Sequence, residues 1–300
     1  MSTRVNLETF ISTTLANVQK STSNMSKLQE QISTGKKVNR ASDDPAAARK
    51  ILSLRSEDLR LDQYASNIQT ATQSLDFNAS ALQNTSDILQ RITELTMQGV
   101  SDTTDQNART IIANEIDTLL ENIVQSGNAK RLGRYTFAGT ETTTVPFEES
   151  RDSQGKISSV AYKGNRETIE YNVGPGTNSV VNLTGQEVFM DSDLFGTIIK
   201  IRDNLLGGTP TAARDELGNL DTAAQTILNS VAKAGGISST LQLTGNRIAD
   251  TKLSLQEVLA SAESADIAEL VLKLTEQQSI FEASLSSGSY IFKTSILNYI

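Results

Sequence analysis

Apolar and small residues recur at alternating steps of four and three from Ile237 to Ile300. This spacing is a heptad repeat, which is typical of a helix that buries one narrow seam against other helices. The repeat slips in register near Ala262 and then continues through Ile267, Val271, Leu274, Gln278, Phe281, Leu285, Gly288 and Phe292. A repeat of this length exceeds an ordinary globular helix, so it predicts helical partners of similar length.

The start of the chain carries a matching repeat. It runs through Ile11, Leu15, Val18, Thr22, Met25, Gln29 and Ile32, with Leu28 beside it. Polar side chains at Thr22, Gln29 and Gln278 dilute the two repeats. Because Ser and Thr are also frequent near the N-terminus, an isolated helix there would be weak. We expect both terminal segments to order fully only against neighbours, with ordinary core packing as the alternative interpretation.

A compact corner follows the first repeat. Gly35 is placed to end the first helix, and Asp44 before Pro45 is a helix cap followed by a proline at the first helical position. Asp43 adds a second carboxylate near the positive end of that helix. The two aspartates could also suggest a metal or acid–base site, but capping accounts for both.

The middle of the chain changes from helical to β-rich and back. Helices are expected over Pro45–Gly99, Asp105–Lys130, Asp191–Leu206 and Ala212–Lys233, with a break at Ala234–Gly236, and strands lie between Leu132 and Leu183. The predicted fold class is mainly α: an elongated antiparallel helical bundle or coiled coil built from both chain ends, with a small β-rich domain inserted in the middle. The expected segments are 1–44, 45–131, 132–190, 191–236 and 237–300.

Composition narrows the functional classes. The chain has 300 residues, a net charge of -8, and neither Cys nor His. The acidic balance argues against nucleic-acid binding, and the missing residues remove the usual zinc ligands and nucleophiles, so we expect no cofactor and no metal. A carboxylate-only enzyme would have to use Asp152, Glu167, Glu170 and Asp191, which lie at loop or strand-edge positions where charges normally face water. We therefore predict a protein that is not an enzyme.

Neither a signal peptide nor a membrane span is predicted. The first residues are polar and lack the apolar region of a secretory signal. No run of about 18 apolar residues occurs, so no contact with a membrane is expected.

The corner carries a resemblance to a known family. The tract from Ser33 to Ala46 resembles the signature between the first two helices of the bacterial flagellins, through Gly35, Asn39, Arg40, Asp43, Asp44 and Pro45. Arg134–Thr140 and the end of the chain from Ser284 are similar to the same family. Within it, Arg40, Pro45 and the Arg134–Gly139 tract favour the hook–filament junction branch over the filament subunits. The resemblance covers roughly the first 150 and the last 65 residues.

That resemblance implies a structural role in the flagellum. The chain would form a junction layer between hook and filament, with hook-associated protein 1, flagellin, further copies of itself and a flagellar export chaperone on its C-terminal segment as partners. It would be extracellular, exported through the flagellar type III apparatus. The expected assembly interface comprises Ile11, Leu15, Val18, Met25, Leu28, Ile32, Ile267, Val271, Leu274, Phe281, Leu285 and Phe292. A filament subunit and an unrelated coiled-coil adaptor are the alternatives.

Overall fold

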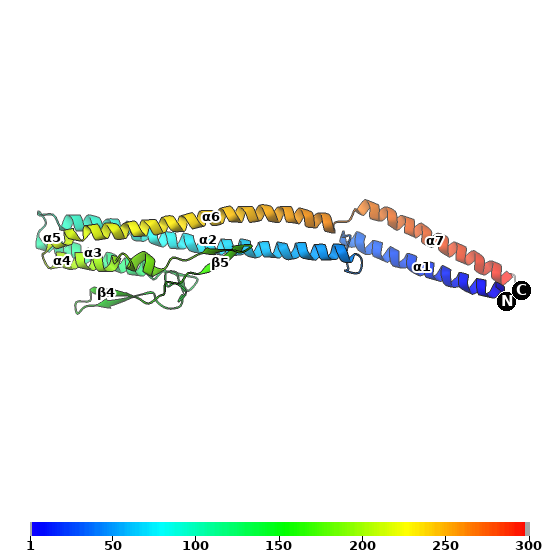
Figure 1. Ribbon diagram of the computed structural model, residues 1–300, viewed down its shortest axis with the longest axis horizontal. Coiled ribbons are helices and arrows are strands. Elements are labelled where there is room, and N and C mark those ends of the chain that lie inside the picture. Colours follow the sequence, from blue (N-terminus) through cyan, green and yellow to red (C-terminus); the bar gives the residue numbers. More distant parts are fainter. Residues whose placement is uncertain (1, 298–300) are drawn as a thin grey trace. The chain divides into compact units, whose positions relative to one another are not determined.

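The computed structural model of the protein describes residues 2–297 and, among them, the side chains of residue 9 and residues 11–289. The helices are α1 (Ser2–Thr34), α2 (Pro45–Gly99), α3 (Gln106–Gly127), α4 (Leu194–Leu206), α5 (Pro210–Asp215), α6 (Leu217–Glu263) and α7 (Ile267–Leu297), with a π-helical turn η1 at Gln186–Met190 (Figure 1). Short strands occur only between α3 and η1 within these residues. The prediction of a mainly helical fold with a small β insert is confirmed.

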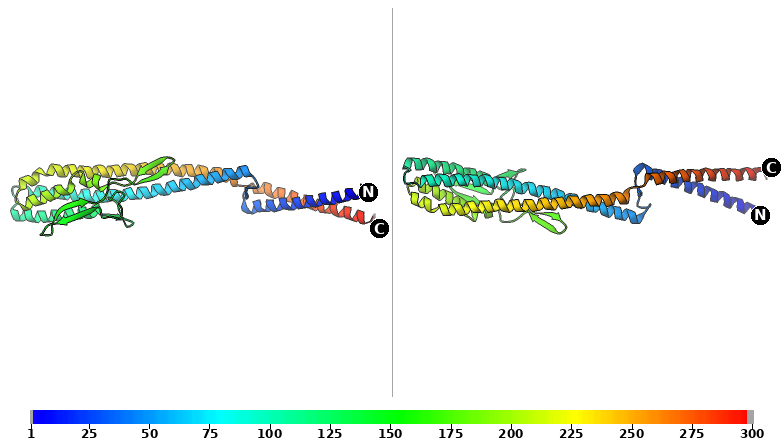
Figure 2. Two further views of the ribbon diagram at one scale, coloured as in Figure 1. Left: turned by 60° about the horizontal axis from the view of Figure 1, so that its bottom comes forward. Right: turned by 90° about the horizontal axis from the view of Figure 1, so that it is seen from above.

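The chain divides into two units, and each is described by itself. Unit 1 comprises Met1–Arg60 and Thr251–Ile300, and unit 2 comprises Leu61–Asp250. In unit 1, α1 and α7 run alongside each other in opposite directions in all three views of the chain (Figures 1 and 2). The two terminal repeats are therefore each other's partners.

The corner between α1 and α2 has the predicted caps. Gly35 ends α1 with a φ of 67°, a conformation in which glycine carries no steric penalty. The Asp44 carboxylate accepts hydrogen bonds from the backbone N–H groups of Ala46 at 3.0 Å and Ala47 at 2.9 Å, and Pro45 is the first residue of α2. These bonds satisfy donors that the first helical turn leaves unpaired.

The predicted break at Ala234–Gly236 is wrong. Helix α6 continues through these residues to Glu263, because packing on both sides outweighs the weak helix propensity of Gly235 and Gly236. Ala234 is buried, and Ser238 donates to Asp76 of α2 at 2.9 Å. The helix before this site and the start of the C-terminal repeat are thus one element.

The helical break lies further along, at the register slip. Residues 264–266 separate α6 from α7, and the Asp266 carboxylate caps α7 by accepting from Ala268 at 2.9 Å and Glu269 at 3.2 Å. The expected single C-terminal stretch is therefore two helices.

Unit 2 holds most of the hydrophobic core. Helices α2 and α3 pack antiparallel, as their short connection predicts, and Arg91 near the end of α2 pairs with Glu115 of α3 at 2.8 Å. Many of the core's completely buried side chains come from four helices: Leu75, Leu82, Leu89 and Ile92 of α2, Ile116, Leu120 and Ile123 of α3, Ile198, Ile201 and Leu205 of α4, and Leu220 and Ile227 of α6.

The β insert consists of three antiparallel hairpins rather than one sheet. They pair β1 (Lys130–Arg131) with β2 (Arg134–Tyr135), β3 (Phe147–Arg151) with β4 (Ile157–Tyr162), and β5 (Glu170–Gly174) with β6 (Thr177–Val180). The β-like region expected from Arg134 onward begins with a strand that ends at Tyr135, because Phe137 is buried and its ring meets Phe189 edge-on at 5.4 Å. Phe147 joins this aromatic cluster at 5.2 Å from Phe189.

One buried amide in α2 predicts a stabilising substitution. Asn78 is buried, and neither its amide nitrogen nor its oxygen has a hydrogen-bond partner among the described residues. Because such a group loses its bonds to water, we expect Asn78→Leu to raise the free energy of unfolding by about 1–3 kcal/mol in urea denaturation. Asn67→Leu is the matched control, since that amide already donates to the Asn172 carbonyl at 2.7 Å. Equal effects from both variants would contradict the explanation.

Candidate assembly surface

The α1–α7 pair buries a seam in which apolar residues alternate with small and polar ones. Along α1 the least exposed positions are Ile11, Thr14, Val18, Ser21, Met25, Leu28 and Ile32, and along α7 they are Leu270, Leu274, Gln277, Phe281, Ser284 and Gly288. Both sets step by three and four, as the predicted heptad requires. A Cβ added to Gly288 would lie 3.3 Å from the Thr14 methyl group, and the Ser21 hydroxyl donates to the Gln277 carbonyl at 3.5 Å.

The predicted seam is divided between two faces of this pair. Seven of the expected interface residues point into it: Ile11, Val18, Met25, Leu28, Ile32, Leu274 and Phe281. Four others are exposed: Leu15 by 57%, Ile267 by 42%, Val271 by 46% and Leu285 by 48%. The side chain of Phe292 lies outside the described residues. When only two helices pack together, each helix buries a single face, so the apolar residues beside the seam remain exposed to solvent.

The exposed residues form what we call the outer stripe: Leu15, Thr22 and Gln29 on α1, and Val271, Gln278 and Leu285 on α7. Each occupies the heptad position that follows a seam residue, and equivalent positions of two antiparallel helices flank the same side of their seam. The contacts of Thr14 with Gly288 and of Ser21 with Gln277 put Leu15 level with Leu285, and Thr22 level with Gln278. The stripe therefore alternates apolar and polar levels along one surface.

The corner is joined to the break between α6 and α7, inside unit 1. The Lys37 N–H donates to the Glu263 carbonyl at 2.8 Å, and the Ala265 N–H donates to the Gly35 carbonyl at 2.9 Å. The Glu263 carboxylate is largely buried and pairs with Lys36 at 3.5 Å and with Arg55 at 2.7 Å. Both chain segments thus change helix at the same level. The sequence analysis did not single out Glu263. Its position beside the slip in the heptad register was the only sequence feature that could have indicated a role.

The family corner residues fold back onto α1. Arg40 pairs with Glu30 at 3.3 Å, and Asp43 pairs with Lys27 at 3.1 Å. The Asn39 side-chain oxygen accepts from the Thr34 hydroxyl at 2.8 Å. These contacts give Arg40 and Asn39 structural roles in holding the corner against the helix that bears the outer stripe.

Acid should loosen this corner. The pKa of Asp43 lies below its ordinary 3.8 because its carboxylate is hydrogen-bonded to Lys27 and accepts from the Arg40 backbone. Because the pKa of Asp43 is lower in the folded protein than in the unfolded chain, the contact stabilises the fold fully at a pH above the unfolded value. That stability is lost as the pH falls through the pKa of the folded protein, so the contact should weaken only below pH 3.8. An NMR titration of the carboxyl group should give a midpoint below that value. Lys27→Met should raise the midpoint, and an unchanged midpoint would contradict the assignment.

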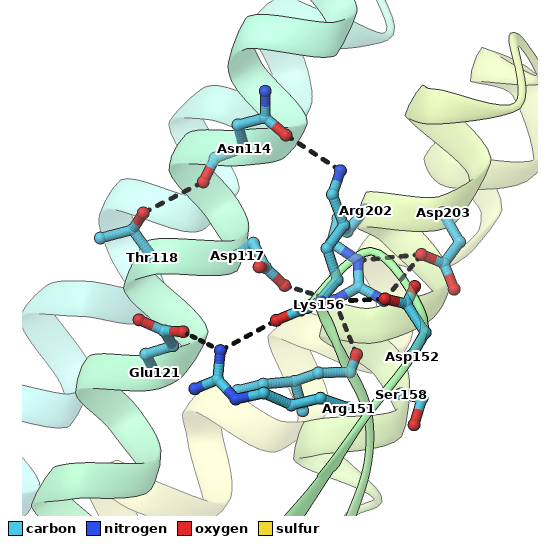
Figure 3. A network of polar contacts seen from close by, with 12 residues as sticks. Asn114, Asp117, Thr118, Glu121, Arg151, Asp152, Lys156, Ser158, Arg202 and Asp203 are labelled. Atoms are coloured by element: carbon cyan, nitrogen blue, oxygen red, sulfur yellow. Dashed lines mark hydrogen bonds and ion pairs between the residues drawn. The ribbon is translucent and has the colours of Figure 1, made fainter.

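A polar network fixes the β3–β4 hairpin in unit 2 (Figure 3). Arg202 of α4 is only 2% exposed, and its guanidinium donates to the Asp117 carboxylate of α3 and to the Ile157 carbonyl of β4 at 2.7 Å. At the same end of the hairpin, Arg151 lies opposite Ile157 in the strand register and joins Glu121 of α3 at 2.7 Å. The network ties two helices to one hairpin through charge-assisted bonds.

This network is structural in character. Asp152 has a lowered pKa because its carboxylate accepts hydrogen bonds from backbone N–H groups, first that of Lys156, as in a turn. Arg166 pairs with Asp191, the Glu167 carboxylate accepts from the Thr140 hydroxyl, and Asn178 donates to Glu170. The four carboxylates of the enzyme alternative are therefore engaged at separate places. Among residues 2–297 no cluster of three acidic, His or Cys side chains fit for a metal occurs, and no helix is long and apolar enough to cross a membrane.

Comparisons with known proteins agree with this geometry. Residues 5–142 match the bacterial flagellin N-terminal helical region. The chain is 32% identical to flagellar hook-associated protein 3 of Escherichia coli K12 over 54% of this chain and 49% of that protein. It is 23% identical to flagellin of Bacillus subtilis over 94% of this chain and 93% of that flagellin. The chain spans about half the length of the hook-associated protein 3 relatives that it matches.

Solved structures show the same fold. A flagellar hook-associated protein from Vibrio parahaemolyticus superposes with a TM-score of 0.67 over 74% of this chain and 100% of that one, at 23% identity. At that identity the likeness concerns the fold alone. The corner signature between α1 and α2 falls inside the matched region. The similarity of residues 5–142 is thus to the N-terminal helical region of bacterial flagellins.

Proposed function

We propose that the chain is a structural component of the bacterial flagellum that forms the junction layer between hook and filament. The observation that carries the proposal is the outer stripe on the α1–α7 pair. Leu15, Val271 and Leu285 expose apolar side chains along one surface of two paired terminal helices. Large apolar side chains left exposed at several levels of one helix pair are the kind of surface that protein–protein contacts cover.

The composition of the seam between α1 and α7 also favours stabilisation of this pair by neighbouring subunits. Ser21, Gln277 and Gly288 contribute little apolar area to the contact between α1 and α7. Fixing the backbone of two long helices is costly in conformational entropy, and a thin seam offsets it poorly. Neighbouring subunits that cover the outer stripe would supply the missing burial, at about 1.5–3 kcal/mol for each Leu or Ile.

The partners follow from the proposed position. The layer would contact hook-associated protein 1 on the hook side, flagellin on the filament side and further copies of this chain within the layer. An export chaperone would hold the C-terminal segment, including α7, before export through the flagellar type III apparatus to the extracellular flagellum. Polar residues at Thr22, Gln29 and Gln278 would keep the exported subunit from associating early.

Cells lacking this gene would test the position. We expect electron microscopy to show bare hooks, with flagellin lost to the medium. Absence of flagellin from both cells and medium would make this chain the filament subunit, the alternative that fits the long match to flagellin. Normal filaments on the mutant cells would contradict both functions. A plasmid copy of the gene should restore filaments and serves as the control.

A further inference from the structure

The tip of the β1–β2 hairpin in unit 2 presents an apolar side chain to water. Leu132 is 89% exposed and has a φ of 50°, in the left-handed region that non-glycine residues rarely occupy. Gly133 follows with a φ of 79°, which completes a tight turn of the type that favours Asn-Gly. The turn geometry therefore does not explain a leucine, whereas a contact made by its side chain would.

Three cations surround this leucine. Lys130 lies over the Tyr135 ring at 4.4 Å, and Arg131 donates to the neutral Gln73 side chain at 3.0 Å. Among the described residues, neither these two nor Arg134 pairs with a carboxylate. A cluster of this kind on a chain with a net charge of -8 is a local reversal of sign. We call residues 130–134 the basic tip.

An open groove of about 770 Å³ lies elsewhere in unit 2, between α3 and β3. Val145 is its exposed apolar residue, with Val124 and Phe147 buried beneath the surface, and three carboxylates line it, from Glu121, Glu148 and Glu149. Two cations face the same space, Arg151 and Lys163.

The three carboxylates of this groove form ion pairs of different length and exposure. Arg151 pairs with Glu121 at 2.7 Å (Figure 3). It also pairs with Glu149 at 2.6 Å, which fixes the groove floor between helix and hairpin. Glu148 is more exposed and meets Lys163 only at 3.5 Å. The groove is thus preformed, exposes Val145, and is open to an added cation at Glu148.

We propose that the basic tip of one copy of this chain docks into the acidic groove of a neighbouring copy. Leu132 would lie against the exposed Val145, and Arg134 would pair with Glu148. Charge complementarity favours the basic tip as the ligand of the groove, because the tip combines an exposed leucine with cations that pair with no carboxylate. Its docking also offsets the electrostatic repulsion between two acidic copies of the chain. The contact joins two different surfaces, so repetition yields a ring or a helical array. The inference rests on the proposed function, since it describes contacts within the layer.

Cysteine cross-linking tests the contact, because the natural chain contains no Cys. Leu132→Cys and Val145→Cys chains would be co-expressed in cells lacking the gene, and isolated flagella treated with a mild oxidant. A disulfide requires Cβ atoms about 3.8 Å apart, so a product joining the two chains reports the docked tip. Ile111→Cys, exposed on α3, replaces Val145→Cys in the control pair. We expect about tenfold more cross-linked product than in the control, from the raised local concentration.

A charge exchange supplies the second measurement. Arg134→Glu and Glu148→Arg should each lower the amount of this chain in isolated flagella about tenfold, and the double variant should restore it. Equal cross-linking in both cysteine pairs, or no restoration by the double variant, would overturn the inference while leaving the proposed function intact if the wild-type chain is present in the flagella. Absence of the wild-type chain from flagella would overturn the proposed function and the inference with it.

Discussion

Replacing Arg202 by methionine is expected to lower the free energy of unfolding of unit 2 by about 3–5 kcal/mol. The guanidinium is buried between α3, α4 and β4, where it serves the Asp117 carboxylate and the Ile157 carbonyl. Methionine keeps the volume and the apolar stem but leaves both acceptors without a donor. A buried carboxylate without its partner is the main source of the loss. Urea denaturation followed by circular dichroism should show a lower midpoint, and hydrogen exchange in β4 should accelerate.

Two further variants separate charge from packing. Asp117→Leu together with Arg202→Met removes the unpaired charge as well, so the double variant should recover most of the lost stability. Arg166→Met is the matched control for loss of an ion pair in water, because its bond to Asp191 lies at the surface, and it should change stability by less than about 1 kcal/mol. A loss in Arg202→Met as small as in Arg166→Met would show that the network is exposed in solution.

Local chemistry made several elements predictable from sequence. The bounds of α2 match the prediction from Pro45 to Gly99, because the Asp44 carboxylate caps the first turn and Pro45 fits the first helical position. Gly35 specifies the end of α1 through its left-handed φ. These signals act within a few residues and need no partner. By contrast, Gly235 and Gly236 looked like a break and are helical, because their conformation is decided by packing against distant α2 residues.

Heptad spacing predicted the pairing of the chain ends but not which flank faces inward. Val18 and Met25 were assigned to the seam and lie there, whereas Leu15 was assigned to it and lies outside. The correct seam instead uses Ser21 and Thr14, whose polarity hid them. In a repeat that is this polar, hydrophobicity cannot distinguish the position inside the seam from the position next to it.

The contacts of unit 2 could not be read from the sequence. Arg202 meets Asp117 across 85 positions of chain, and the basic tip and acidic groove are defined only once α3 and the hairpins are placed. No spacing rule links such residues, because helix and strand periodicities act within one element. Charge counts gave the net value of -8 but not the local reversal around Leu132.

Replacing Leu285 by aspartate is expected to weaken incorporation of this chain into flagella by about 10- to 100-fold, through loss of about 1.5–3 kcal/mol of apolar burial. Leu285 is half exposed on α7 and lies level with Leu15 of α1. A carboxylate there leaves the seam of the pair unchanged but would be buried when a neighbour covers the outer stripe. Immunoblots of isolated flagella, with flagellin measured in the medium, would check the effect.

The control places the same charge on the other side of the helix. Ala283 is exposed and stands two residues before Leu285, so its side chain faces away from the outer stripe. Ala283→Asp should therefore leave incorporation near the wild-type level, whereas the reverse change, Gln278→Leu with Thr22→Leu, should promote self-association of the purified chain in sedimentation experiments. Equal losses from Ala283→Asp and Leu285→Asp would mean that α7 is covered on all sides or that the charge acts on the helix itself. In either case the outer stripe would not be the surface that directs assembly.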